Sequence, residues 1–119
     1  SVLILRKIKI KKNSIFKIVD YVGNNSNFAK LDYFFDYLLK KNNSEFTDIY
    51  SYGLPEINLS SAGFKKIQLN TKIIAPNHFE PLEKKNIDIN CAFKSLKNEK
   101  NIRIFRGDGD GDRPSIIKM

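Results

Sequence analysis

Residues 16–41, FKIVDYVGNNSNFAKLDYFFDYLLKK, constrain the fold most strongly, because they predict a strand, a polar turn and an amphipathic helix in direct succession. The strand half alternates, with Phe16 and Ile18 on one face and Lys17 on the other, and its β-branched and aromatic content suits a partly buried sheet. Apolar side chains then recur at helical spacing through residues 28–41. We therefore expect a helix that packs on the strand preceding it.

The turn inside this stretch is the first candidate for a binding site. Gly23 can take a positive φ where the chain leaves the strand. Ser26 or Asn27 is a natural N-cap, because short polar side chains accept hydrogen bonds from free backbone N–H groups. Unpaired N–H groups at the start of a helix can also bind an anion. An ordinary capped turn is the competing interpretation.

Further elements follow from the apolar pattern of the rest of the chain. The other predicted strands are residues 2–10, 46–52, 64–69, 87–93 and 102–106, and a short helix is predicted over residues 55–62. Gly63 stands where a C-terminal cap glycine belongs. The polar connector 11–14 predicts an antiparallel first pair of strands, and the helical crossover predicts that the second and third strands are parallel.

Together these elements predict an α+β fold with a mixed, mostly antiparallel sheet of about six strands, one long helix and one short helix. Residues 1–106 form one domain, which we expect to be the C-terminal part of a longer protein, and residues 107–119 form a tail rich in Gly, Asp and Pro. The predicted core comprises Phe16, Ile18, Leu31, Phe35, Leu38, Ile49 and Phe64.

Charge and composition limit the classes of function. The 21 basic residues exceed the 13 acidic residues, for a net charge of +8, which favours anionic partners but also agrees with a lysine-rich soluble surface. One cysteine and one histidine exclude a disulfide framework and a cysteine-based zinc site. No apolar run approaches the ~20 residues of a membrane-spanning helix, and no signal peptide is recognisable. We expect a cytoplasmic protein.

Three further residues are candidates for catalysis. His78 and Glu80 lie between two prolines, where the imidazole can serve as a general base next to a carboxylate. Tyr52 ends a predicted strand. Exposed, inactive side chains are the competing interpretation for all three.

No metal site is expected. The alternating aspartates Asp108, Asp110 and Asp112 resemble the opening of a calcium loop, but its twelfth position, which requires Glu, is Met119. Nucleic-acid binding is not expected either, because no motif supports it and the aromatic residues form core-like stripes.

The order of the elements over residues 15–69 resembles the C-terminal half of GNAT-fold acyltransferases. In that family the loop after the central strand carries a Gln/Arg-x-x-Gly-x-Gly/Ala pattern, and its backbone amides bind the pyrophosphate of acyl-coenzyme A. The matching stretch here is DYVGNN, in which Gly23 falls on the middle Gly, while Asp20 and Asn25 replace the other two motif residues. The segment LSSAGFK also resembles the helix-to-strand junction of the family. Two later stretches, IAPNHFEP and DGDGDRP, resemble tails of acyltransferase-like proteins from surface-polysaccharide gene clusters.

The resemblance implies an acyltransferase that acts on an amino sugar or a nucleotide sugar. Its donor is acyl-coenzyme A, held as a co-substrate and not as a tightly bound cofactor, and the donor phosphates contact Gly23, Asn24, Asn25, Ser26 and Asn27. The resemblance places Tyr52 near the acyl site, where a Tyr can act as a general acid, and His78 and Glu80 remain the catalytic candidates named above from the sequence. The alternative is a binding or interaction module that keeps the fold without the cofactor. The sequence predicts no oligomeric state.

Overall fold

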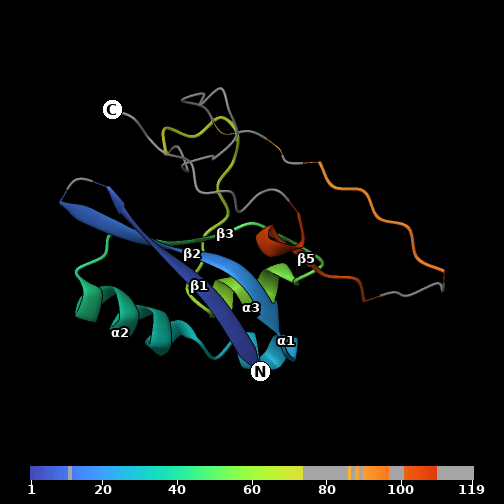
Figure 1. Ribbon diagram of the computed structural model, residues 1–119, viewed down its shortest axis with the longest axis horizontal. Coiled ribbons are helices and arrows are strands. Elements are labelled where there is room, and N and C mark those ends of the chain that lie inside the picture. The colour runs from blue at the N-terminus through green and yellow to red at the C-terminus, as the bar shows by residue number, and fades with distance from the viewer. Residues whose placement is uncertain (11, 74–85, 87, 89, 97–100, 110–119) are drawn as a thin grey trace.

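The computed structural model of the protein describes residues 1–10, 12–73, 86, 88, 90–96 and 101–109. Figure 1 shows a twisted hairpin with helices on one side of it. The hairpin consists of β1 (Val2–Ile10) and β2 (Asn13–Val22), which pair antiparallel as the connector predicts. The third strand, β3 (Thr47–Ile49), pairs with β2 in parallel, so the predicted crossover is also confirmed. The order in this sheet is β1-β2-β3.

The central strand β2 is irregular at one position. Ile4 of β1 faces Asp20, while Leu5 faces Ile18, so Val19 has no partner in β1 and forms a bulge. The pairing of β2 with β3 also ends at Ile18. Beyond that point the 3-10 helix η1 (Arg106–Asp108) packs beside β2.

The prediction of one continuous long helix is wrong. It is divided into a single turn, α1 (Asn25–Phe28), and the longer α2 (Asp32–Asn42). Neither helix is capped by the side chain of Ser26 or Asn27: the cap positions are Asn24 and Leu31, and neither makes a side-chain cap bond. The break lets α1 direct Phe28 into the core while α2 follows the sheet in another direction (Figure 1). Tertiary packing therefore outweighs the continuous helical pattern.

Elements in the second half differ more from the prediction. The stretch 46–52 is divided into β3 and β4 (Ser51–Tyr52), and β4 pairs antiparallel with β5 (Ile104–Phe105) in a second, two-stranded sheet. The short helix is confirmed as α3 (Glu56–Ser61), followed by Gly63 at φ +88°.

Two predicted strands are not found among the residues that the structure describes. Residues 64–69 join no sheet, because Phe64 packs against the core whereas the apolar side chains after it, Ile67 and Leu69, are exposed. Of the range 87–93, the residues that the structure describes belong to no strand, and Phe93 is exposed. Over the described part of the chain the fold is therefore α+β, as predicted, but with five strands in two small sheets.

The core lies between the sheet, the helices and β5, and it is rich in aromatic rings. Its buried members are Ile18, Tyr21, Phe28, Phe35, Leu54, Ala62 and Phe105. Of the predicted core, Phe16, Ile18 and Phe35 are buried; Leu31, Ile49 and Phe64 are partly buried against this cluster. Leu38 is only partly buried and lies outside the cluster. The Phe28 ring meets Tyr21 edge to face at 5.0 Å, a favourable geometry for aromatic pairs.

Candidate functional site

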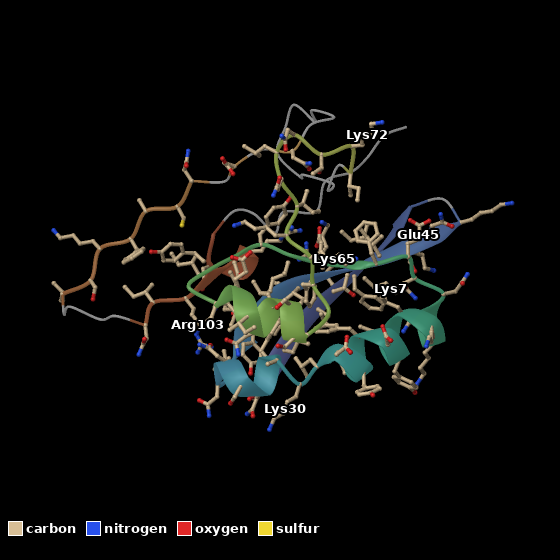
Figure 2. All side chains as sticks on the ribbon, turned by 180° about the vertical axis from the view of Figure 1, so that it is seen from behind. Lys7, Lys30, Glu45, Lys65, Lys72 and Arg103 are labelled. Atoms are coloured by element: carbon tan, nitrogen blue, oxygen red, sulfur yellow. The ribbon has the colours of Figure 1, made fainter. Side chains whose placement is uncertain are left out.

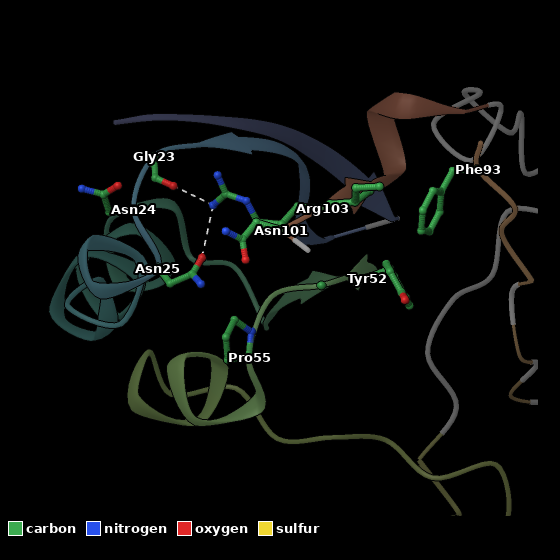
Figure 3. A pocket seen from close by; sticks show the side chains of 10 residues that line it. Gly23, Asn24, Asn25, Tyr52, Pro55, Phe93, Asn101 and Arg103 are labelled. Atoms are coloured by element: carbon green, nitrogen blue, oxygen red, sulfur yellow. Dashed lines mark hydrogen bonds between the residues drawn. The ribbon is translucent and has the colours of Figure 1, made fainter. Parts of the chain in front are cut away.

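A cavity of about 710 Å³ lies at the end of β2, within the size range of small-molecule sites. Three chain segments and one separate residue line it (Figure 3). The first segment is loop 23–25. The second runs from Tyr52, the last residue of β4, to Pro55, and the third is 101–103, directly before β5. Phe93 adds a further side chain. The cavity therefore joins residues that lie about 80 positions apart in the sequence.

Arg103 provides the positive charge of this cavity. Its side chain is half-buried, and its Nη1 donates hydrogen bonds to the Gly23 carbonyl oxygen at 2.6 Å and to Asn25 Oδ1 at 3.2 Å (Figure 3). The guanidinium carbon lies 5.9 Å from the centre of the Tyr21 ring. Within the part of the chain that the structure describes, the other guanidinium N–H groups of Arg103 bond to no protein atom. These groups are available to an anion.

The backbone of loop 23–25 differs from the expectation. Gly23 does not have a positive φ; among the described glycines only Gly53 and Gly63 do. Gly23 is required by close approach, because a Cβ there would meet the side chains of Ser1 and Tyr21. The Tyr21 hydroxyl also donates to the Asn24 carbonyl oxygen at 2.7 Å. Two carbonyl oxygens of the loop are thus bonded to side chains, and Arg103 is the group that would meet an anion.

Gly53 forms the opposite wall of the cavity. Its φ is +80°, which L-residues with a Cβ rarely adopt, and a Cβ would collide with the Ile102 carbonyl oxygen. Glycine therefore allows the chain after β4 to pass directly over the segment that carries Arg103.

Two aromatic rings form the outer part of the cavity. Tyr52 and Phe93 are 52% and 51% exposed, and their ring centres lie 5.9 Å apart with the planes tilted by 50°. Half-exposed rings beside a cation are typical of surfaces that stack a planar ligand group.

The structure brings together only part of the predicted site. Gly23, Asn24, Asn25 and Tyr52 all line the cavity. Ser26 and Asn27 do not line it; Asn27 instead donates from Nδ2 to Ser1 Oγ at 3.1 Å. His78 and Glu80 lie outside the described residues, so their roles stay predictions.

Sequence reasoning missed the two arginines of the last described segment, Arg103 and Arg106. The scarcity of arginine was a signal for them, because only 4 of the 21 basic residues are Arg. Arg is favoured over Lys where a site needs a planar fork of hydrogen-bond donors. The two belong to different sites, because Arg106 does not line the cavity.

A second polar cluster lies on the sheet itself. Lys17 of β2 is 1% exposed and donates from Nζ to Asp48 Oδ2 of β3 at 2.6 Å. The Arg106 guanidinium lies 4.4 Å from the centre of the Tyr50 ring. Burial, and secondly the Asp48 carboxylate, raise the pKa of Tyr50 above its ordinary value of 10.0, while Arg106 opposes this effect.

Neither a metal centre nor a membrane span is found in the described residues. No group of three or more His, Cys, Asp or Glu side chains gathers there in a way that would hold a metal ion. No helix there is both long and apolar enough to cross a bilayer.

Comparison with known proteins gives no relative for this fold and site. No family model, no curated protein and no solved structure matches the chain. The function must therefore be argued from the cavity and its chemistry.

Proposed function

We propose that the cavity beside loop 23–25 binds the phosphate-bearing part of a nucleotide ligand, either acyl-coenzyme A or a nucleotide sugar. The observation that carries this proposal is Arg103, whose free N–H groups lie at a cavity large enough for such a ligand. A guanidinium recognises phosphate oxygens with two parallel hydrogen bonds. The net charge of +8 adds long-range attraction for an anion.

The aromatic pair supports a ligand that carries a base as well as phosphate. The half-exposed rings of Tyr52 and Phe93 offer an apolar face to a planar heterocycle. The side chains of Asn24, Asn25 and Asn101 add donors and acceptors to the same cavity. This combination of a cation, stacking rings and amide groups is suited to a nucleotide.

Acyl transfer to an amino sugar is the reaction that we propose for this ligand. The order β1, β2, α1, α2, β3, β4 and α3, with β2 and β3 parallel, supports the resemblance to the C-terminal half of GNAT-fold acyltransferases. In such a reaction the acceptor amine attacks the thioester carbonyl, a C–N bond forms and the C–S bond breaks. His78 with Glu80 would take the proton from the amine, and Tyr52 would donate one to the departing sulfur. Positioning both substrates in one site supplies much of the acceleration.

Ligand-dependent thermal stabilisation tests the binding step. Acetyl-coenzyme A and a uridine-diphosphate sugar, each at about 100 times its Kd, should raise the Tm by several degrees because a ligand stabilises the state that it binds. Arg103→Gln should abolish the shift. Arg103→Lys should keep only part of it, because the ammonium keeps the charge but lacks the fork. Lys65→Gln, which removes an exposed charge outside the cavity, should leave it unchanged. No shift with the wild-type protein would refute nucleotide binding.

A non-catalytic binding module is the second candidate. The observations that favour it are Arg103 and the pair of aromatic rings, which account for binding a ligand and require no catalytic group. Release of free coenzyme A thiol in the presence of an amino sugar separates the two functions. Cys91 is an exposed free thiol that would react with the detection reagent, so the assay requires Cys91→Ser. Binding without thiol release would establish the module.

A further inference from the structure

The outer face of α2 carries three aromatic side chains that the proposed function does not use. Tyr33, Phe34 and Tyr37 are 87%, 40% and 58% exposed. If an aromatic residue offers about 200 Å² of surface, the three together expose about 350–400 Å². That area falls in the range of the largest apolar patches on monomeric proteins, which are often functional. Figure 2 shows α2 at the margin of the molecule, away from Arg103 and the cavity.

Contacts within the chain hold two of these rings in place. The Phe34 ring meets the buried Phe35 ring edge to face, with the ring centres 5.5 Å apart. Lys41 Nζ lies 5.4 Å from the centre of the Tyr37 ring, one turn further along α2. Side chains that are already ordered lose little conformational entropy when a partner binds. The aromatic face is therefore preorganised for an interface.

The charged residues of α2 are divided by sign along the helix. Asp32 and Asp36 lie in its first half, whereas Lys40 and Lys41 lie in its last turn, and all four are exposed. Within the part of the chain that the structure describes, none of the four belongs to an ion pair. The acidic half would repel an anionic membrane or a nucleic acid. A partner that matches both halves must present the opposite signs in the opposite order, as an antiparallel copy of α2 does.

We propose that the outer face of α2 binds a second copy of this chain, with the two α2 helices antiparallel about a twofold axis. Asp36 and Lys40 are four residues apart and therefore lie on the same flank of the helix. A twofold axis that crosses the middle of α2 brings this flank of both copies together in opposite directions. Asp36 of each copy then meets Lys40 of the other. The aromatic rings form the centre of the interface, and the charged side chains form its rim.

The size of the face determines the strength of the dimer. Its aromatic area is about half of the ~800 Å² that a standard interface buries on each partner. We therefore expect a weak dimer, with a Kd of about 10–100 µM. Sedimentation equilibrium of the wild-type protein at about 10–500 µM and low salt should show a reversible monomer–dimer equilibrium. A protein that stays monomeric at the highest concentration would overturn the proposal.

Charge reversal locates the interface. Asp36→Lys and Lys40→Asp each place like charges opposite one another in the dimer, so each should raise the Kd by at least about tenfold. The double variant restores opposite signs and should return the Kd to within about threefold of the wild-type value. Glu56→Lys is the matched control, because it changes the net charge as Asp36→Lys does but lies on α3, and it should leave the Kd unchanged. Failure of the double variant to restore the dimer, or an equal effect of Glu56→Lys, would refute this arrangement.

Removal of one ring distinguishes a dimer interface from a membrane-binding surface. Tyr37→Ala should raise the Kd without loss of the fold, because the ring is more than half exposed. An undiminished dimer in Tyr37→Ala would place the contact elsewhere on the molecule. Vesicles that contain phosphatidylserine should not co-sediment with the wild-type protein. Binding of the wild type but not of Tyr37→Ala to these vesicles would assign the face to a membrane surface and contradict the proposal.

Discussion

Lys17 is the residue whose environment departs most from its usual one. Lysine is almost never fully buried unless it is paired, and Lys17 is 1% exposed on the central strand. Its ammonium is held by the Asp48 carboxylate of the neighbouring parallel strand, directly opposite in register. Once such a pair is buried, removing one partner leaves a charge without compensation.

Asp48→Asn should therefore destabilise the protein by about 3–5 kcal/mol, because it removes the buried negative charge that lies 2.6 Å from Lys17 Nζ and 3.6 Å from Arg106 Nη2. Urea unfolding in phosphate-free buffer measures this loss of stability. The matched control is Glu56→Gln, which breaks the exposed ion pair with Lys66, 3.9 Å long, and should change nothing measurable. Equal effects of the two substitutions would show that the buried pair contributes no more than the exposed one.

Tyr50 should make stability depend on alkaline pH. Burial raises its pKa in the folded state above the ordinary 10.0, so the folded protein holds this proton more tightly than the unfolded chain. The resulting stabilisation is fully present below pH 10.0 and is lost as the pH rises from there through the folded pKa. Tyr50→Phe should thus lose less stability between pH 9 and pH 11 than the wild type, as measured by urea midpoints. Parallel decline in both proteins would contradict the raised pKa.

The burial of single residues was predictable where it follows from the spacing of apolar residues along the chain. Phe16, Ile18 and Phe35 are buried as their spacing predicts. Lys17 was expected on the opposite face, but its full burial depends on Asp48, 31 residues away, which no local pattern reveals. The same limit applies to Arg103, whose partner Gly23 is 80 residues distant. Gly23, Asn24 and Asn25 could be proposed from sequence because they lie in the recognisable turn between a strand and a helix, and Tyr52 because it ends a predicted strand.

At the scale of elements, the sequence predicted correctly how helices and strands adjacent in the chain pair, but it did not predict pairing between strands far apart in the chain. The hairpin, the parallel crossover and α3 depend on short connections and caps, and all three are confirmed. The strand predicted at 102–106 does form over two residues, as β5, and it pairs with β4, from which it is separated by about 50 residues. A strand pattern in an apolar stretch does not identify the strand with which that stretch will pair.

The C-terminal cap of α3 allows a precise test. Gly63 has φ +88°, so Gly63→Ala should cost about 1–2 kcal/mol from backbone strain. The Cβ would also approach Asp32 Oδ1, but that exposed carboxylate can move. Gly109→Ala is the control, because Gly109 has extended dihedrals and nothing lies within 4 Å of the position of its Cβ. Chemical unfolding should show no loss for Gly109→Ala, and a similar loss in both variants would exclude the strain.

Over the whole molecule, the segment that begins with β5 unites the two sheets. Phe105 is 5% exposed and belongs to the core cluster, with its ring centre 6.5 Å from that of Tyr21. Its backbone N–H is bonded to Asp108 Oδ2 at 2.7 Å, which fixes the start of η1. The small sheet of β4 and β5 therefore shares one core with the large sheet.

Phe105→Ala should destabilise the entire protein by about 3–5 kcal/mol, since it opens a cavity at this junction. Circular dichroism and aromatic fluorescence should lose their signals at the same urea concentration, because one core unfolds as one unit. Phe93→Ala is the control; its ring is half exposed, and its loss should affect ligand binding more than stability. Separate transitions of the two signals would show that the sheets unfold independently.

The late position of Phe105 in the chain also affects the protein during its synthesis. About 40 residues separate Phe64 from Phe105, so at about 5–20 residues per second the ribosome needs about 2–8 s to deliver the second ring after the first. Throughout that interval the nascent chain holds Tyr21 and Phe28 without the ring that completes their cluster. The aromatic cluster around Tyr21 and Phe28 therefore cannot be completed until Phe105 has been synthesised and has left the ribosome.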